Sequence, residues 1–170
     1  VHFVVLASFF RFAYLEGSVS LWLVVAALST GLSAAASAIV TAHELGHKKP
    51  KSPGWRLARF LLFSVNYPHF TTEHNHNHHK WVATDRDPAS AYEDEGLWSF
   101  WFRTIPSQYL SSVRVHNSKG RTGMRNPSYQ GLTLQVAALG VMFMLPQGQT
   151  MVVGWLILST IAILTLEYVN

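Results

Sequence analysis

The feature that most restricts the fold of this chain is a run of 25 residues without a charge, from Ser18 to Ala42. As a helix rising about 1.5 Å per residue, this run is long enough to cross the roughly 30 Å hydrocarbon core of a bilayer. Two further runs, 131–145 and 150–166, also lack charges and are separated by the turn-forming sequence PQGQ. The three runs predict membrane-spanning helices, and the last two predict a helical hairpin.

The charged residues are few and are gathered in the middle of the chain. Only 13% of the 170 residues are charged, against about 25% in ordinary soluble domains, and 49% are hydrophobic. Twelve of the thirteen Lys and Arg residues lie between Lys48 and Arg125, which predicts a cytoplasmic part near residues 48–126 between apolar segments. This distribution does not form the basic, aromatic face of a soluble nucleic-acid-binding protein, so we expect no nucleic-acid partner.

These patterns predict an all-α fold, a polytopic membrane helical bundle with three to four transmembrane helices. We treat residues 1–170 as a single fragment of an integral-membrane domain, since the chain begins without Met and ends inside an apolar run. Residues 1–12 are expected to be the end of a transmembrane helix or an interfacial segment. Residues 55–65 predict a helix at the membrane surface, and Pro106 predicts a helix break.

The histidines are concentrated in one window, since seven of the nine lie between His43 and His79. In "HELGHK", His43 and His47 are four residues apart, so a helix brings their Cβ atoms within about 5 to 6 Å on one face. In "EHNHNHHK", His74 and His78 repeat this spacing and His79 follows directly. Five such histidines exceed what one tetrahedral zinc with an open position can use, and two ions fit better.

The chemistry of the ligands narrows the choice of metal without deciding it. The chain contains no cysteine, so any metal must be bound by nitrogen and oxygen atoms. Imidazole-rich ligation suits non-haem iron that handles dioxygen, although zinc and copper also accept imidazole. His43 and His47 follow the long apolar run, and the histidines of "EHNHNHHK" lie in the polar part of the chain. We therefore expect these histidines at the cytoplasmic ends of helices.

Three stretches of the chain resemble the membrane-bound di-iron alkane monooxygenases, within the larger group of membrane fatty acid desaturases and hydroxylases. "HELGHK" resembles the first histidine box, and "EHNHNHHKWVATDRDPASA" resembles the second box, E-H-N-x-G-H-H, with the V-A-T-x-x-D-P-A-S stretch that follows it. "LEYVN" resembles the lead-in to the N-Y-x-E-H-Y-G-L motif. Asn77 stands where the family usually has glycine, and His76 occupies its variable position.

The resemblance implies a set of metal ligands and their surroundings. It implies that two non-haem iron ions are bound, with O2 as cosubstrate and the remaining ligands outside this fragment, and that the ligands here are His43, His47, His74, His78 and His79. Residues expected to orient or surround these ligands are Glu44, Glu73, His69 and His76.

The resemblance also implies an activity, which is oxygen-dependent hydroxylation of the terminal methyl of medium- or long-chain alkanes. Electrons would come from a rubredoxin or ferredoxin through its reductase. The protein would lie in the lipid bilayer, with the bacterial inner membrane expected and the metal site facing the cytoplasm. An apolar channel could bind the alkane-like substrate without a polar anchor, because each buried methylene contributes about 0.8 kcal/mol. Small residues such as Gly31, Ala34 and Ala38 would permit close helix packing beside it.

Three alternatives stay open. An enzyme of the same superfamily could act on a xylene-type aromatic methyl or on a fatty acyl chain. The pattern H-E-x-x-H is also that of zinc proteases, in which Glu44 would be the general base. A non-enzymatic membrane protein could bind or transport metal. Other polar residues are expected to be less specific: a solvated face for Asp85, Asp87 and residues 93–95, headgroup contacts for Arg103 and Arg114, surface positions for His2 and His116, and a water-accessible helix end for Glu167.

Overall fold

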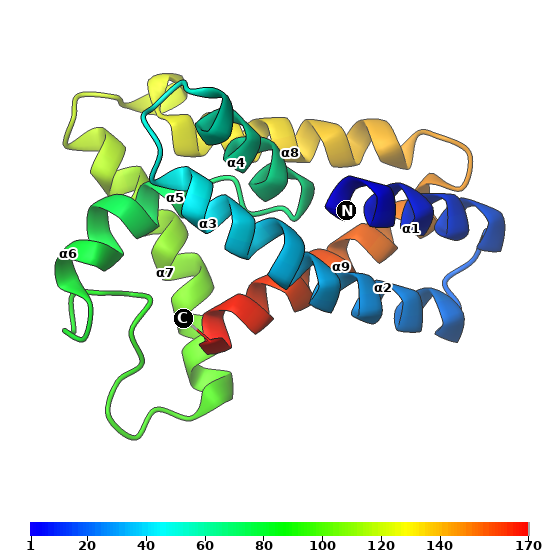
Figure 1. Ribbon diagram of the computed structural model, residues 1–170, viewed down its shortest axis with the longest axis horizontal. Helices are drawn as coiled ribbons and strands as arrows, with labels where there is room; N and C mark the ends of the chain where they lie inside the picture. The colour runs from blue at the N-terminus through cyan, green and yellow to red at the C-terminus, as the bar shows by residue number, and fades with distance from the viewer. Residues whose placement is uncertain (170) are drawn as a thin grey trace. The chain divides into compact units, whose positions relative to one another are not determined.

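The computed structural model describes residues 1–169, except for the side chain of Val169, so Asn170 at the end of "LEYVN" lies outside the described residues. Within that range every regular element is a helix, which confirms the all-α prediction. The helices form two compact units, one made of residues 1–67 and 134–169 and the other of residues 68–133 (Figure 1). Each unit has its own packing and carries its own group of histidines.

The first unit contains most of the apolar helices. Its elements are α1 (His2–Glu16), α2 (Leu21–Ala34), the π-helix η1 (Ala35–Val40), α3 (Thr41–Gly46), α4 (Pro53–Ser64), the second part of α8 (Pro127–Phe143) and α9 (Gly148–Val169). The elements α2, η1 and α3 follow one another without a break, so the helix continues into "HELGH" as predicted. It begins where Ser20 Oγ accepts a hydrogen bond from the Leu23 amide, 3.1 Å away.

Helix α2 lies beside α9 in the first unit (Figure 1). The close approach depends on Gly31, because a Cβ at this position would lie 2.6 Å from the Leu158 carbonyl oxygen and 2.8 Å from the Ile161 Cβ. Ala34 and Ala38 on the same helix are buried. These contacts confirm that the small residues of this helix face protein.

Two helices among the described residues are long and apolar enough to cross a membrane, Leu21–Gly46 and Gly148–Tyr168. Helix α1, with 15 residues, and α8, with 17 residues, are shorter. The predicted spans at 18–42 and 150–166 therefore correspond to candidate membrane helices. The turn between α8 and α9 lies where PQGQ predicted it, with Gln147 in a left-handed conformation (φ 58°).

Polar side chains link the helices of the first unit. His2 was expected at the surface, but it is buried, and its Nε2 lies 2.8 Å from Ser64 Oγ on α4. Trp155 Nε1 on α9 donates a 2.7 Å hydrogen bond to the Ser64 carbonyl. The expected water access of Glu167 is also wrong, since its carboxylate is buried and accepts a 2.7 Å hydrogen bond from the Tyr67 hydroxyl. Such contacts satisfy polar atoms that would be costly to bury unpaired.

The second unit contains the polar part of the chain. Its elements are α5 (Phe70–Glu73), the π-helix η2 (His74–His78), α6 (His79–Trp81), a segment without regular helix over residues 82–96, α7 (Leu97–Asn117), the 3-10 helix η3 (Gly123–Arg125) and the first turns of α8. His116 on α7 was expected at the surface, but it is buried and its Nε2 lies 3.2 Å from Thr72 Oγ1 on α5. This contact joins α7 to the helix that leads into the histidines.

Helix α7 runs through Pro106 without interruption, so the predicted break is wrong. Proline removes one hydrogen bond of the helix, the one that would reach the carbonyl of Phe102. Pro106 and Phe102 are both exposed, so solvent can reach this face of the helix. The remaining hydrogen bonds of the helix therefore outweigh the one that is lost.

Candidate metal centre

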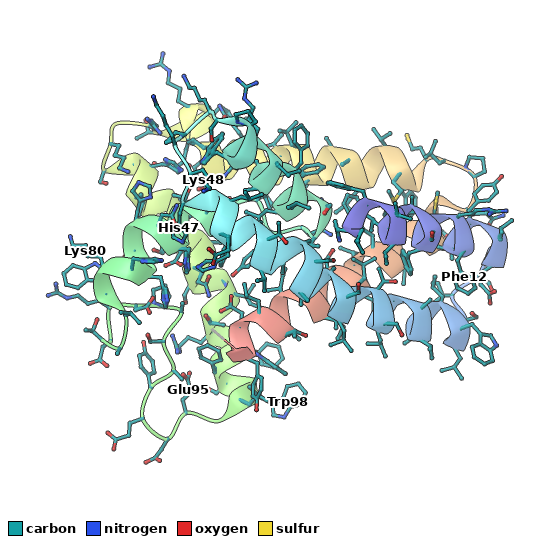
Figure 2. The ribbon with its side chains drawn as sticks, in the orientation of Figure 1. Phe12, His47, Lys48, Lys80, Glu95 and Trp98 are labelled. Carbon is teal, nitrogen blue, oxygen red and sulfur yellow. The ribbon has the colours of Figure 1, made fainter. Side chains whose placement is uncertain are left out.

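The first histidine pair lies at the C-terminal end of α3. His43 and His47 face each other as the i, i+4 spacing predicts, with their Nε2 atoms 3.4 Å apart and their rings at 84°. Figure 2 labels His47 and Lys48 at this end of the helix. On the far side of the His43 ring, Nδ1 lies 3.0 Å from Glu44 Oε1. The two Nε2 atoms therefore lie side by side, and the Glu44 carboxylate contacts the other nitrogen of the His43 ring.

In the second histidine cluster, His74 and His78 lie on the π-helix η2, and His79 follows directly as the first residue of α6. The His79 amide donates its hydrogen bond to the His74 carbonyl, five residues back. This geometry brings His79 to His74, with their Nε2 atoms 2.9 Å apart. The His74 and His78 rings are stacked with centroids 5.1 Å apart. Three imidazoles therefore share one face, and the closest pair is i, i+5.

The hydrogen bond to Asp87 fixes the orientation of His78. His78 Nδ1 lies 2.8 Å from Asp87 Oδ2, and the carboxylate also accepts hydrogen bonds from Ser90 Oγ and the Ala89 amide. Burial raises the pKa of the Asp87 carboxyl, but the hydrogen bonds from His78, Ser90 and Ala89 outweigh it and hold that pKa below its usual range. An ionised Asp87 can only accept, so His78 donates from Nδ1 and its Nε2 is the atom with the lone pair.

Asp87 lies beside the second histidine cluster, where it was not predicted. It was expected on a solvated face, but it is fully buried. The signal was its place in "DPAS", since an aspartate followed by proline and serine forms a local turn in which the side chain accepts backbone hydrogen bonds. In the structure the Ser90 amide donates to the Asp87 carbonyl, 3.3 Å away, which closes that turn.

The other residues expected around the ligands have different surroundings. Glu73 is buried, and its Oε1 accepts hydrogen bonds from Asn77 Nδ2 at 3.1 Å and Ser111 Oγ at 3.5 Å. The His69 ring packs edge-on against Tyr109, with centroids 5.2 Å apart. His76 is exposed and its Nδ1 lies 3.2 Å from the Thr72 carbonyl.

The separations between the imidazole nitrogens fit a shared metal ion in each group. With metal–nitrogen distances of about 2.0 to 2.1 Å, two ligands meeting at about 90° lie about 2.9 Å apart, and two meeting at about 110° lie about 3.4 Å apart. The two Nε2 pairs are separated by 2.9 and 3.4 Å. Carboxylates on Nδ1 of His43 and His78 are the partners that metal-bound imidazoles normally have. The donor set is therefore compatible with metal ions that accept imidazole, iron among them.

This chain is similar to known proteins over most of its length. Residues 20–170 match the protein family described as Fatty acid desaturase. The chain is 39% identical over 122 residues to an alkane 1-monooxygenase of Pseudomonas putida, which covers 71% of this chain and 30% of that protein. It is 36% identical over 116 residues to an alkane 1-monooxygenase of Ectopseudomonas oleovorans, covering 67% of this chain and 29% of that protein.

A third relative, alkane 1-monooxygenase 1 of Alcanivorax borkumensis, is 44% identical over 72 residues, which are 42% of this chain and 18% of that protein. The chain thus spans less than a third of the length of the curated relatives that it matches. The family match covers 151 of its 170 residues, counting from 20 to 170. This chain, with two apolar helices of membrane-spanning length and a group of histidines in each unit, belongs to the fatty acid desaturase family.

Proposed function

We propose that this chain is part of a membrane-bound, oxygen-dependent di-iron monooxygenase that hydroxylates the terminal methyl of medium- or long-chain alkanes. The observation that carries the proposal is the pairing of imidazole Nε2 atoms at 3.4 Å on α3 and 2.9 Å across η2. The similarity to proteins named alkane 1-monooxygenase supports the substrate class. The imidazole pairs support the metal centre, and the similarity to named relatives supports the substrate.

The proposed ligands of the two iron ions are His43, His47, His74, His78 and His79, with further ligands supplied from outside this segment. When bound, the iron pair supplies activation of O2, so that alkane, O2, two electrons and two protons give a primary alcohol and water. Carboxylate side chains hold two of these ligands, His78 and His43, in one tautomer. Asp87 accepts a hydrogen bond from Nδ1 of His78, and Glu44 is placed to accept one from Nδ1 of His43.

Glu44 is engaged in a way that disfavours the zinc-protease alternative. A general base in H-E-x-x-H must direct its carboxylate towards a metal-bound water. Here Oε1 lies against Nδ1 of the neighbouring His43, 3.0 Å away. We therefore propose that Glu44 orients His43. The proposed orienting or surrounding roles of Glu73, His69 and His76 are supported less directly. Glu73 and His76 lie on the helical segment α5–η2, and His69 is the residue that precedes it.

The proposed substrate and partners follow from the membrane setting. An alkane dissolves in lipid and gains about 0.8 kcal/mol for each methylene that is buried in an apolar channel. A rubredoxin or ferredoxin with its reductase would supply the two electrons. We propose the bacterial inner membrane as the location, with the metal site facing the cytoplasm, where these donors are found and where the positive charge of residues 48–126 is expected.

The proposal is tested with the full-length protein in bacterial membranes that lack other alkane hydroxylases. The membranes receive rubredoxin, its reductase, NADH, octane or hexadecane, and 18O2. We expect 1-alkanol that carries one labelled oxygen atom, and two iron ions per chain. His74→Ala serves as the matched control, because it removes a ligand and leaves the membrane helices of the first unit unchanged.

The outcomes separate the alternatives. Labelled alcohol from p-xylene or a fatty acyl substrate, with none from alkanes, would assign a different substrate to the same type of oxygenase. Acyl chains are the second candidate, because the matched family is described as Fatty acid desaturase. One zinc ion per chain with peptide cleavage that Glu44→Gln abolishes would favour a protease. Reversible metal binding without oxygen consumption would favour a metal-binding or transport protein.

A further inference from the structure

Arg103 on α7 joins three points of the segment between α6 and α7. Its Nε donates to Glu95 Oε1 at 2.7 Å, and its Nη2 donates to Glu95 Oε2 at 2.7 Å. The same guanidinium donates to the Ser90 carbonyl at 2.8 Å and to the Pro88 carbonyl at 3.2 Å. All three nitrogens are therefore used, and the expected role of Arg103 as a headgroup contact is wrong.

The setting of Arg103 makes these bonds strong. A two-point contact between guanidinium and carboxylate is shorter and stronger than a neutral hydrogen bond. The guanidinium also lies over the Tyr92 ring, 4.0 Å from its centroid, and the Arg103 side chain is only 21% exposed. The hydrogen bonds that Arg103 donates to Glu95 raise the pKa of Arg103 despite its partial burial. A lysine could reproduce the charge but not this fork of donors.

The backbone that Arg103 holds is the turn that carries Asp87. Pro88 and Ser90 are the first and third residues after Asp87 in the chain. Ser90 Oγ also donates a hydrogen bond to Asp87 Oδ2 at 2.6 Å. Asp87 in turn accepts a hydrogen bond from Nδ1 of His78. A chain of contacts thus runs from the guanidinium through the turn and the buried carboxylate to an imidazole of η2. Each contact lies within the second unit.

We infer that Arg103 is a positioning residue of the metal centre, which acts on His78 by fixing the Asp87 turn. The inference rests on the proposed function only in taking His78 as a metal ligand. The segment over residues 82–96 has no regular helix, and Asp87 is held by short backbone turns, with hydrogen bonds from its amide to the Thr84 carbonyl and from the Ser90 amide to its own carbonyl. Arg103 belongs to a helix of 21 residues and supplies the fixed point.

The test compares Arg103→Gln with Arg114→Gln in the full-length protein. Arg114 is a matched control because it lies on the same helix and lines the same cavity of about 280 Å3 as Arg103. Among the described residues, no hydrogen bond or ion pair joins its side chain to the segment 82–96. The measurement is the rate at which a chelator removes the bound metal. Because removing a direct partner of a ligand typically costs 10–100-fold in metal affinity, we expect about three- to tenfold faster release for Arg103→Gln and no change for Arg114→Gln.

A double-mutant cycle separates positioning from general stabilisation. If Arg103 acts through Asp87, then Arg103→Gln should add nothing to the faster release that Asp87→Asn already causes. Additive effects, or equal release from the Arg103 and Arg114 variants, would overturn the inference. Should Arg103→Gln fail to fold, Arg103→Lys and Glu95→Gln take its place in the same cycle, each with an expected release rate between those of the wild type and Asp87→Asn.

The release assay also distinguishes this inference from the proposed function. It follows whichever metal the histidines hold, so a protein with a single zinc ion would overturn the di-iron proposal while the Arg103 comparison still decided the role of Arg103. A protein that holds two iron ions and releases them equally fast with and without Arg103 would overturn only the inference. A protein that binds no metal would overturn both.

Discussion

The two histidine groups are built on different kinds of helix. His43 lies on α3 and His47 follows the last residue of that helix, at i, i+4, with Nε2 atoms 3.4 Å apart. His74 and His79 meet across a π-helix, at i, i+5, with Nε2 atoms 2.9 Å apart. Their supporting carboxylates differ as well, since Glu44 is 73% exposed and Asp87 is fully buried.

This difference separates what local spacing determines from what it does not. An α-helix needs only two histidines four residues apart to place both on one face. A π-helix is rare and occurs frequently at functional sites, and its one additional residue in the turn changes which side chains meet. In η2 the additional residue makes His79 the neighbour of His74, and the stacked His78 can then turn its Nδ1 towards Asp87.

Removing one residue from η2 should therefore have the largest effect. Deletion of His76 shortens the turn by one residue, so His74 and His79 become i, i+4 and the ring that bonds to Asp87 is rotated around the helix. We expect loss of metal from this group and at least about a 100-fold loss of alkane hydroxylation, the scale seen when the support of a metal ligand is removed. Metal content per chain and 1-alkanol yield measure it.

His76→Ala is the control for this deletion. The side chain is exposed and its hydrogen bond is to the Thr72 carbonyl, so the substitution keeps the length of the turn and removes only that bond. We expect wild-type metal content and activity. If the deletion were tolerated, the π-helix would be irrelevant to metal binding; if His76→Ala were as damaging, His76 itself would be a ligand.

Asp87→Asn should weaken the second group by about 10- to 100-fold in metal affinity. Asparagine keeps the size of the side chain but replaces an ionised acceptor with a neutral amide, which leaves His78 without a charged partner at Nδ1. Metal competition with a chelator measures the affinity. Asp85→Asn is the matched control, because Asp85 lies two residues away and is exposed; equal effects of the two substitutions would contradict the role of Asp87.

The support of the first pair can be tested at Gly31, on the helix that leads to His43. A Cβ here would meet the Leu158 carbonyl at 2.6 Å, and backbone cannot move away as a flexible side chain could. We expect Gly31→Ala to lower the free energy of unfolding by about 1 to 3 kcal/mol, as measured by denaturation in detergent. Gly140→Ala, on α8 with no atom within 4 Å of its added Cβ, should be neutral or slightly stabilising.

The sequence was sufficient for two of the three predicted membrane helices and for the first pair, and insufficient for the second group. Charge-free runs predicted both membrane-length helices, and small residues predicted the close packing at Gly31, because these depend on local composition. The prediction of a helix break at Pro106 failed because neighbouring turns of α7 compensate for one missing hydrogen bond. His116 and Asp87 were placed wrongly because their burial depends on partners 44 and 9 residues away, Thr72 and His78.

The smallest effect is expected from Glu44→Gln, and its smallness is the informative result. Glu44 contacts His43 from an exposed position, where hydrogen bonds between a carboxylate and an imidazole compete with water. A glutamine can still accept the Nδ1 proton, so metal content should be unchanged and alkane hydroxylation should fall by less than about threefold, well below the effect of Asp87→Asn. Product formation at saturating O2 and electron donor measures it. In a zinc protease the same substitution would remove the general base and abolish turnover. A loss of all activity with full metal content would therefore identify Glu44 as a catalytic base and contradict its proposed role in orienting His43.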